Sequence, residues 1–233
     1  MDRLELIHQS LNFNGGKRYL EIGVRTCSNL FEVKCENKVG VDPNYRLSKK
    51  DKIRRTLGLE RSKLFKMYSD DFFSQNLKGI LDNGFDVIFV DGLHNYEQSL
   101  KDVENGLKYL NKDGVIILHD CNPTSAARAT PVKNSFDELV PKIKSGQIEG
   151  WDGGWNGDVW KTIVHLRSTR TDLSIITIDD DQGLGVILNR DEENHISVDL
   201  HELEQADYGF LEKDRRTLLN LKSENELQHF FEG

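Results

Sequence analysis

Two unbroken apolar segments constrain the fold of this chain most strongly, because both are followed by the same two residue types. The segment "FDVIFVDGLHNY" is apolar through residues 87–90 and then reaches Asp91 and His94. The segment "GVIILHDCNP" has an apolar run after its glycine and ends in His119 and Asp120. Such runs are typical of strands that are buried on both faces. We therefore expect two buried strands whose ends place Asp and His at the rim of one site.

Strand and helix patterns alternate from residue 17 to about residue 120. The strands are apolar runs rather than alternating ones, which indicates an α/β fold with a parallel sheet and helices on both faces. Ligands of such sheets bind outside the carboxyl ends of the strands. The candidates for a site are therefore the residues at those ends: Glu21, Asp42, Ser69 or Asp70, Asp91 and Asp120.

The length of 233 residues is ample for one domain and short for two, so we expect a single domain over residues 1–233. Helices are predicted at residues 72–83 and 132–145. "LSIITID" and "GLGVILNR" are separated by a short turn and predict a hairpin. The predicted parts are an N-terminal helix (1–14), a cofactor-binding half (17–120), a substrate or lid region (121–160), terminal strands (172–190) and C-terminal helices (200–230).

Composition argues against several classes of protein. The net charge of −8 argues against nucleic acid as a partner. No apolar run reaches the roughly 20 residues of a membrane helix, and the N-terminus lacks the layout of a signal peptide, so we expect no membrane partner. Three cysteines without zinc-ligand spacing indicate free thiols in a reducing cytosol and predict a cytoplasmic protein. The basic segment at residues 46–55 is interpreted as a solvated helix face, or as a guide for an anionic substrate.

The turn after the first predicted strand carries Glu21 and Gly23. A glycine at this point lets the backbone pass close to a ligand. Arg25 and Cys27 stand where a dinucleotide-binding pattern has glycines, which argues against an NAD-dependent oxidoreductase. Asp42 lies 19 positions after Gly23, close to the ~20 expected for an acid that binds a ribose diol. A surface Asp-Pro turn is the alternative.

Ser69 and Asp70 fall at the end of the third predicted strand, in "MYSDDFF". At this place they could bind the edge of an adenine ring. The competing interpretation is a helix start, with Ser69 as the N-cap and the acids in the first turn. The two interpretations are compatible.

In order and spacing, these motifs resemble those of class I S-adenosylmethionine-dependent methyltransferases, most closely the macrocin-type O-methyltransferases, which act on sugar hydroxyls of natural products. The resemblance covers about residues 18–190 and depends on "DGLHNY", "HD" and "GDVWK". It implies a Rossmann-like, mostly parallel seven-stranded sheet with an antiparallel hairpin at its C-terminal edge. It also implies S-adenosylmethionine as the cofactor, with these contact residues: Glu21, Gly23, Asp42, Ser69, Asp70 and Asp91.

The resemblance further implies a divalent cation, Mg²⁺, with Asp91 and Asp120 as metal ligands, and His94 beside Asp91 as the general base. His119 stands where metal-binding relatives carry a second carboxylate. We include His119 in the metal set, with Asn122 as an alternative oxygen donor. The competing interpretations are a buried His119 satisfied by Asp91 or Asp120, and a His94 that only bonds to a main-chain carbonyl.

The residue types suit this chemistry. A sugar hydroxyl is a weak nucleophile that needs a base within about 3 Å, and histidine, with a pKa near ~6.5, can be a free base at neutral pH. We expect methyl transfer to a hydroxyl of a sugar or small polar metabolite, with Mg²⁺ assistance. A metal-independent N-methyltransferase of an amino sugar and a non-catalytic cofactor-binding protein stay open, as does a homo-oligomer.

The segment "GWDGGWNGDVWK" permits two interpretations. Trp151 and Trp155 could form a mobile lid that stacks on a sugar ring, or they could anchor the core. Trp160 is predicted to be a core residue. Asp158 is predicted to cap the following helix or to bind substrate. Cys121 lies beside the predicted site and is interpreted as lining.

Overall fold

The computed structural model describes residues 1–191 and 195–233, which form two compact units. The N-terminal unit consists of residues 2–92 and 102–117, and the C-terminal unit of residue 1 and residues 93–101 and 118–233. The boundary between the units falls inside the predicted cofactor-binding half. The single domain and its predicted parts therefore stay a prediction.

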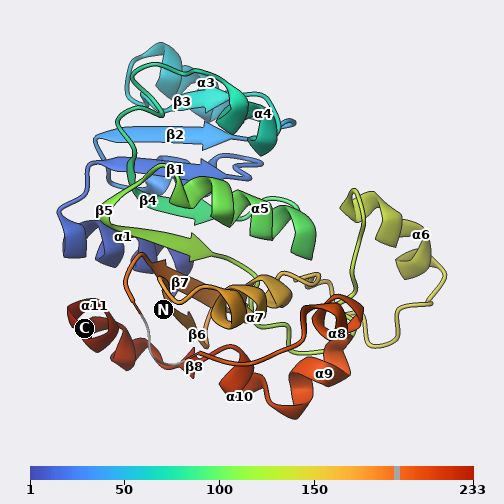
Figure 1. Cartoon of the computed structure of the whole chain (residues 1–233). Coiled ribbons are helices and arrows are strands. Elements are labelled where there is room, and N and C mark those ends of the chain that lie inside the picture. The colour runs from blue at the N-terminus through green and yellow to red at the C-terminus, as the bar shows by residue number, and fades with distance from the viewer. Residues whose placement is uncertain (192–194) are drawn as a thin grey trace. The chain divides into compact units, whose positions relative to one another are not determined.

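The strands of the N-terminal unit form a parallel sheet (Figure 1). β1 pairs with β2 on one side and with β4 on the other, and β2 pairs with β3, all in parallel. β5 is the neighbour of β4 in strand order. Apolar sequence explains the strands, since the side chains of Phe85, Ile88 and Phe89 in β4 are all buried. The strands are β1 (Arg18–Ile22), β2 (Asn37–Val41), β3 (Lys63–Phe65), β4 (Phe85–Val90) and β5 (Leu110–Leu118).

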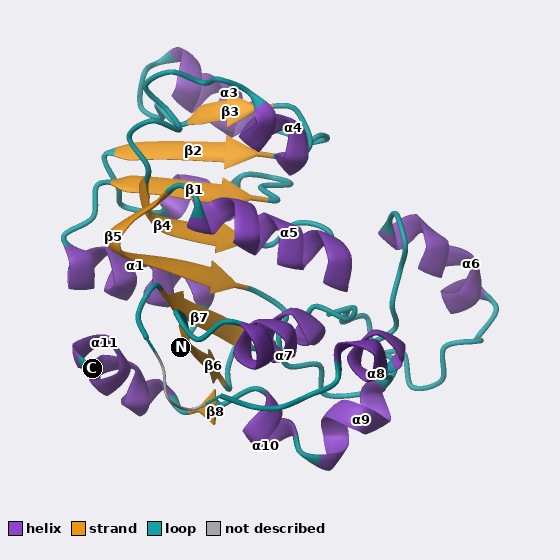
Figure 2. Cartoon of the chain, in the orientation of Figure 1, coloured by secondary structure: helices purple, strands orange, loops and turns teal. Residues whose placement is uncertain are grey.

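Helices lie before and between these strands along the chain (Figure 2). The first helix starts where the Asp2 side chain accepts a hydrogen bond from the Glu5 amide, and it ends at Gly15, which has a φ of 62°. A glycine tolerates this left-handed conformation, so the sequence fixes the end of the helix. The helices are α1 (Arg3–Asn14), α2 (Ser28–Glu32), α3 (Lys49–Thr56), α4 (Ser69–Ser74) and α5 (Tyr96–Leu107).

The C-terminal unit contains the predicted hairpin. β6 (Ser174–Ile178) and β7 (Leu184–Leu188) are antiparallel, and both are buried along their whole length. The short β8 (Leu221–Lys222) pairs in parallel with β6. Trp160 is buried, as predicted for a core residue. The helices are α6 (Leu139–Lys144), α7 (Trp160–Thr169), α8 (Leu200–Gln205), α9 (Tyr208–Lys213), α10 (Arg215–Leu218) and α11 (Leu227–Glu232).

The structure corrects three details of the prediction. The helix predicted at residues 72–83 is wrong, because α4 spans Ser69–Ser74 and Gly79, with a φ of 73°, lies in the turns that follow. The helix predicted at residues 132–145 is shorter, since α6 is preceded by a 3-10 turn at Phe136–Glu138. The described residues contain eight strands rather than seven, because the two-residue β8 is too short to leave a pattern. None of the described helices is long and apolar enough to cross a bilayer.

Candidate functional site

The turn after β1 contains a buried carboxyl group. Glu21 accepts hydrogen bonds at Oε2 from the Tyr19 hydroxyl, at 2.7 Å, and from the Asn29 amide, at 2.8 Å. Burial raises the pKa of Glu21 to about 7, because the charged form loses its hydration. At neutral pH this carboxyl group is therefore poised between its two protonation states.

Position 23 requires a glycine because of its backbone conformation and because another part of the backbone lies close to it. Its φ is 89°, and a Cβ at this position would lie 1.9 Å from the main-chain oxygen of Asp91. The sequence predicted close passage of a ligand here, and the structure shows that the close neighbour is the backbone at the end of β4. Contact of Gly23 with a cofactor stays a prediction.

Asp42 joins the loops that follow β1 and β2. Its Oδ2 accepts a hydrogen bond from the Arg25 amide at 2.8 Å, and its Oδ1 accepts one from the Asn44 amide at 2.6 Å. The second bond is the Asx turn expected of the surface-turn interpretation. A carboxylate has about four lone-pair positions, so these two bonds leave acceptor capacity for a ribose diol.

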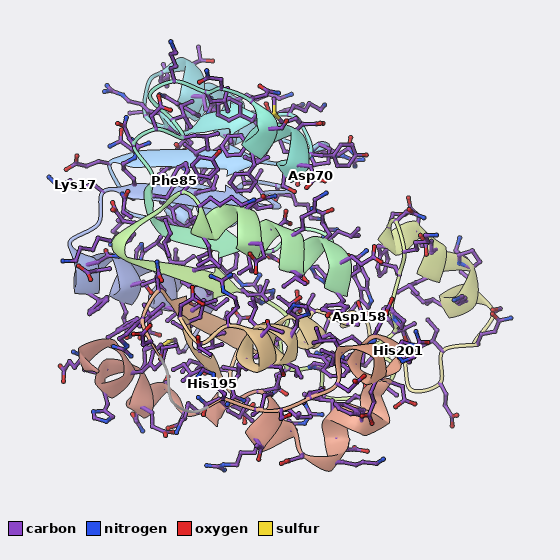
Figure 3. All side chains as sticks on the ribbon, in the orientation of Figure 1. Lys17, Asp70, Phe85, Asp158, His195 and His201 are labelled. Carbon is purple, nitrogen blue, oxygen red and sulfur yellow. The ribbon has the colours of Figure 1, made fainter. Side chains whose placement is uncertain are left out.

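Ser69 and Asp70 lie in the first turn of α4. The N-cap of this helix is Tyr68, which makes no side-chain cap, so the predicted Ser69 cap is wrong. The Ser69 side chain is instead buried as the first helical residue. Figure 3 labels Asp70 toward the carboxyl end of the strands, away from Lys17, which precedes β1. Asp70 is therefore on the side where a cofactor is expected.

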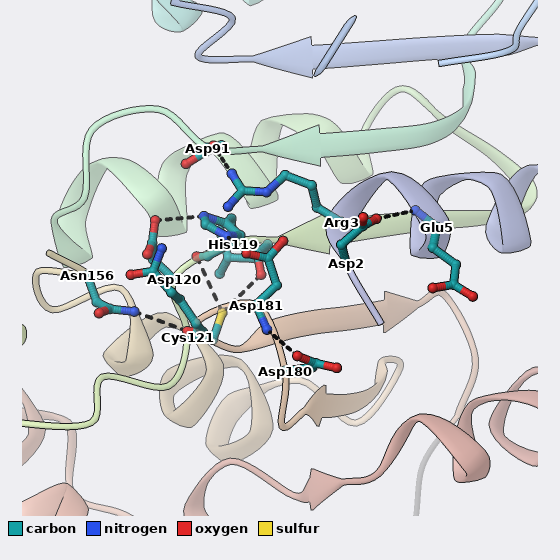
Figure 4. A network of polar contacts seen from close by, with 12 residues as sticks. Asp2, Arg3, Glu5, Asp91, His119, Asp120, Cys121, Asn156, Asp180 and Asp181 are labelled. Carbon is teal, nitrogen blue, oxygen red and sulfur yellow. Dashed lines mark hydrogen bonds and ion pairs between the residues drawn. The ribbon is translucent and has the colours of Figure 1, made fainter. Parts of the chain in front are cut away.

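Asp91 at the end of β4 has a cationic partner for which the sequence contains no signal. The Nη1 atom of Arg3, in α1, lies 3.1 Å from Oδ2 of Asp91 (Figure 4). Arg3 is 88 residues away along the chain. The guanidinium group neutralises part of the charge of a carboxylate that the sequence assigned to cofactor and metal binding.

Both ring nitrogens of His94 face oxygen atoms. Its Nδ1 lies 3.2 Å from the main-chain oxygen of Trp155, and its Nε2 lies 3.2 Å from Oδ2 of Asp120. The imidazole also stacks on the Trp155 ring, with centroids 4.7 Å apart and planes 20° apart. A carbonyl oxygen only accepts, so Nδ1 must carry a proton. The carbonyl bond of the competing interpretation is present. A role of Nε2 in proton transfer stays a prediction.

Asp120 is the centre of this arrangement. Its side chain is 1% exposed and its φ is 62°, in the left-handed region. The Oδ2 atom faces both His94 Nε2 and His119 Nδ1, the latter at 2.8 Å. The Oδ1 atom is buried and has no hydrogen-bond partner among the described residues. A buried carboxylate oxygen without a donor is costly, so this atom is a ready acceptor for a cation or a hydroxyl group.

His119 lies between two acids. Beside its bond to Asp120, its Nε2 is 3.6 Å from Oδ1 of Asp181 (Figure 4). This geometry matches the competing interpretation, in which His119 is a buried histidine that forms a hydrogen bond with Asp120. A role for His119 as a metal ligand stays a prediction.

Asn122 does not offer the free oxygen that the sequence suggested. Arg215 donates a hydrogen bond to its Oδ1, and its Nδ2 donates to Oδ1 of Asp179 at 2.8 Å. Because the oxygen is already bonded to a guanidinium group, Asn122 is a poor candidate for a metal ligand in this arrangement.

Asn156 is a polar residue that the sequence analysis missed. Its Nδ2 donates to the main-chain oxygen of Gln182 at 3.0 Å, and its buried Oδ1 has no hydrogen-bond partner among the residues described. Figure 4 draws Asn156 in the same network as Asp120. The sequence analysis did not single out Asn156, because the glycines and tryptophans around it suggested a lid.

The segment "GDVWK" has a structural role. Oδ1 of Asp158 accepts a hydrogen bond from the Tyr96 amide at 2.8 Å and thereby caps α5. The predicted cap on the following helix is wrong, because the N-cap of α7 is Val159. Burial raises the pKa of Asp158 and lowers that of Lys161, whose Nζ donates to the main-chain oxygen of Glu204. These charged residues therefore connect helices within the C-terminal unit.

Cys121 was predicted as lining, and Trp151 and Trp155 were predicted as a lid or as core residues. Cys121 is fully buried, and burial raises the pKa of its thiol, so it is not a thiolate nucleophile. Phe136 lies 5.1 Å from Trp155 and 6.3 Å from Trp151 between ring centroids. These rings form an aromatic cluster that continues from the face of His94.

Comparison with known proteins finds a similar family and a similar viral protein. The family described as "Methyltransferase domain" matches residues 20–121. An uncharacterised protein of Acanthamoeba polyphaga mimivirus is 30% identical over 139 residues, which cover 55% of this chain and 62% of that relative. The chain thus spans less than two thirds of the length of that relative.

Solved structures are similar at low identity. A Staphylococcus aureus protein, provisionally described as a caffeoyl-CoA O-methyltransferase, is 17% identical with a TM-score of 0.53, over 81% of this chain and 84% of that one. An SAH-bound methyltransferase of Podospora anserina is also 17% identical, with a TM-score of 0.51, over 82% and 78% of the two chains. Residues 20–121 are thus similar to a methyltransferase domain, and the likeness to the solved structures shows an α/β, Rossmann-like fold with a mostly parallel sheet and an antiparallel pair of strands.

Proposed function

We propose that this protein is an S-adenosylmethionine-dependent methyltransferase that transfers a methyl group to a hydroxyl of a sugar or another small polar metabolite. The observation that carries the proposal is the position of His94, which follows β4 and is held between Trp155 and Asp120. The methyltransferase domain at residues 20–121 and the SAH-bound state of a structural relative support the choice of cofactor.

The cofactor is proposed to contact residues after β1, β2, β3 and β4. Asp42 retains acceptor capacity for the ribose diol, and Ser69 and Asp70 are in reach of the strand ends where an adenine ring would bind. The sulfonium of the cofactor needs no activation by the protein. Catalysis therefore consists mainly of aligning the nucleophile, the methyl group and the sulfur atom. The proposed cofactor contacts are Glu21, Gly23, Asp42, Ser69, Asp70 and Asp91.

His94 is proposed as the general base, acting at Nε2. With Nδ1 protonated on the Trp155 oxygen, the lone pair of Nε2 accepts the hydroxyl proton while the oxygen attacks the methyl group. The resulting imidazolium lies beside the Asp120 carboxylate, which stabilises it. The methyl group leaves the sulfur, which keeps the bonding electron pair, and the products are the methyl ether and S-adenosylhomocysteine.

A divalent cation fits the residues present. Oδ1 of Asp120 is buried and has no hydrogen-bond partner among the described residues. Asp91, three residues before His94 in the chain, is proposed as the second carboxylate because the sequence motif implies it. Carboxylate oxygens are ligands that Mg²⁺ prefers. When bound by Asp91 and Asp120, Mg²⁺ would lower the pKa of a hydroxyl group that it holds.

A metal-independent methyltransferase of an amino group is the second candidate. The observation that favours it is the ion pair of Arg3 with Asp91, since a guanidinium group already stands beside a proposed metal ligand. His119 in place of a carboxylate points the same way. An amine needs only to be neutral and aligned, so it requires less activation than a hydroxyl group.

Calorimetric titration of S-adenosylhomocysteine tests the proposal, first with Mg²⁺ and then with excess EDTA. We expect binding in both conditions, and absence of binding in both would overturn the methyltransferase assignment. Turnover of S-adenosylmethionine with sugar and amino-sugar acceptors then separates the candidates. Loss of activity in EDTA supports the hydroxyl acceptor, and full activity in EDTA supports the amine. Binding without turnover on any acceptor supports a non-catalytic protein.

A further inference from the structure

Helix α3 exposes apolar side chains that the proposed function does not use. Ile53, Leu57 and Leu59 are 60%, 66% and 69% exposed, and no residue of α3 is buried. The three lysines of the same helix are exposed as well. We call this surface the basic–apolar patch, and it consists of Lys49, Lys50, Lys52, Ile53, Leu57 and Leu59.

The end of α3 brings the apolar residues of the patch together. The amide of Leu59 donates to the oxygen of Arg54, and the amide of Gly58 donates to that of Arg55, with Gly58 at a φ of 69°. This is the Schellman pattern, which places Leu59 near Ile53 on one side of the helix end. Leu57 lies four positions after Ile53 and so shares the same face. The three side chains therefore form one ridge.

A buried ion pair holds this ridge in place. Glu60, directly after Leu59, turns inward and pairs with Nζ of Lys38 at 3.1 Å, and it also accepts the Ser62 amide at 2.8 Å. The Arg55 side chain donates to the main-chain oxygen of Ser62 at 2.9 Å. Because its neighbours are fixed inward, Leu59 is kept outward, and the patch is formed before any partner arrives.

Positive charge is concentrated around the basic–apolar patch. Residues 46–66 contain nine Lys and Arg against two Asp and Glu, a local charge of +7. The whole chain carries −8, so the remaining residues carry −15. Among the exposed basic residues of this segment are Arg46, Arg61, Lys63 and Lys66, in addition to the lysines of the patch. An anionic surface would thus be attracted to one end of the N-terminal unit, at the edge strand β3.

We propose that the basic–apolar patch binds an anionic lipid surface. Lysines around exposed aliphatic side chains are the composition of a helix that lies in a bilayer interface, with the cations at the phosphates and the aliphatic groups at the acyl boundary. Phosphates of a nucleic acid would engage the lysines and leave Ile53, Leu57 and Leu59 in water. The sequence analysis predicted no membrane partner because it found no membrane-spanning segment. The exposure of the ridge is visible only in the structure.

Vesicle co-sedimentation of the full chain tests the proposal. The probes are vesicles of pure phosphatidylcholine and vesicles with about a quarter phosphatidylserine, an anionic lipid. We expect binding to the anionic vesicles only. Replacing the ridge, Ile53→Ser with Leu57→Ser and Leu59→Ser, should weaken binding by about tenfold or more, since the apolar contribution is lost. Replacing Lys49, Lys50 and Lys52 by Gln should weaken it to a similar extent.

The matched controls are Leu200→Ser, an exposed leucine of α8, and the pair Lys142→Gln and Lys144→Gln in α6, which should bind as the unchanged protein does. Circular dichroism confirms that each variant is folded. Absence of binding to anionic vesicles overturns the proposal, and so does undiminished binding of the ridge variant, which would show a purely electrostatic contact. Tighter binding to a single-stranded RNA oligonucleotide, measured by fluorescence anisotropy, would assign the patch to nucleic acid instead.

Discussion

The Nδ1 atom of His94 lies 3.2 Å from the main-chain oxygen of Trp155, and the two rings stack. This contact selects the tautomer of the imidazole, because the oxygen cannot donate. The ring stacking restricts rotation about the side chain. A main-chain oxygen and an aromatic face together thus orient the proposed base toward Asp120.

Replacing His94 separates catalysis from cofactor binding. His94→Gln keeps a polar side chain but cannot take the hydroxyl proton, so we expect kcat to fall by about 10²–10⁴-fold. Binding of S-adenosylhomocysteine, measured by calorimetry, should be unchanged. Wild-type turnover in this variant would show that the base is another group.

Replacing Asp120 separates its charge from its backbone conformation. Asparagine tolerates a φ of 62° and retains a hydrogen-bond acceptor, so Asp120→Asn should unfold near the wild-type temperature while its turnover falls. Asp120→Ala has no side-chain acceptor and does not tolerate the positive φ, so we expect it to lose about 1–2 kcal/mol of stability. Calorimetric unfolding and steady-state kinetics on both variants provide the comparison. Equal activity of Asp120→Asn and the unchanged protein would exclude a role for the charge.

Gly23 should be one of the least replaceable glycines. Gly23→Ala forces a Cβ to within 1.9 Å of the Asp91 oxygen at a φ of 89°, and we expect a loss of about 3 kcal/mol or more in the free energy of unfolding. Gly15→Ala is the matched control, since its φ is 62° and no atom lies within 4 Å, which leaves only the backbone penalty of about 1 kcal/mol. Urea unfolding gives both values, and similar losses would contradict the close approach at Gly23.

Glu21 should make stability depend on pH. Its pKa is raised from 4.5 to about 7 in the folded chain, so the folded state holds this proton over a range in which the unfolded state has lost it. The stabilisation by the protonated carboxyl group is complete below the unfolded pKa and is lost as the pH rises toward 7. Its size is about 3 kcal/mol at most. Glu21→Gln lacks this dependence.

Urea unfolding at about pH 5 and about pH 7.5 tests this expectation. The unchanged protein should lose stability relative to Glu21→Gln over that interval, because only the glutamate must ionise in a buried position. A constant difference between the two proteins would show that Glu21 does not titrate there. The Tyr19 and Asn29 bonds to Oε2 should be kept in the glutamine variant through its amide oxygen.

Features that depend on the strands alone could be predicted from the sequence. The positions of Asp91 and Asp120 after buried strands could be predicted, because such apolar runs are typical of strands that are buried on both faces. The hairpin of β6 and β7 was predicted from its two apolar runs and is confirmed. The length of α4 was predicted wrongly, because Gly79 is a single residue within an otherwise helical pattern.

The partners of the site could not be predicted in the same way. The oxygen that Trp155 offers to His94 belongs to the main chain and is the same for every residue type. The pairing of Arg3 with Asp91 joins residues 88 positions apart, and nothing in the identity of an arginine specifies its partner. The vacant acceptor on Asn156 follows from the bond that its amide makes to Gln182. These features depend on tertiary packing rather than on local pattern.

The cap that Asp158 places on α5 also separates residues that must be kept from residues that can change. The cap fixes the first residue of α5, Tyr96, two positions after His94, and Gly157 packs against the main-chain oxygen of His94. Residues 123–154 can therefore vary in length and shape without moving the proposed base, provided that Gly157 and Asp158 are kept. A chain with the proposed activity can change its acceptor by loop replacement while the proposed base keeps its position.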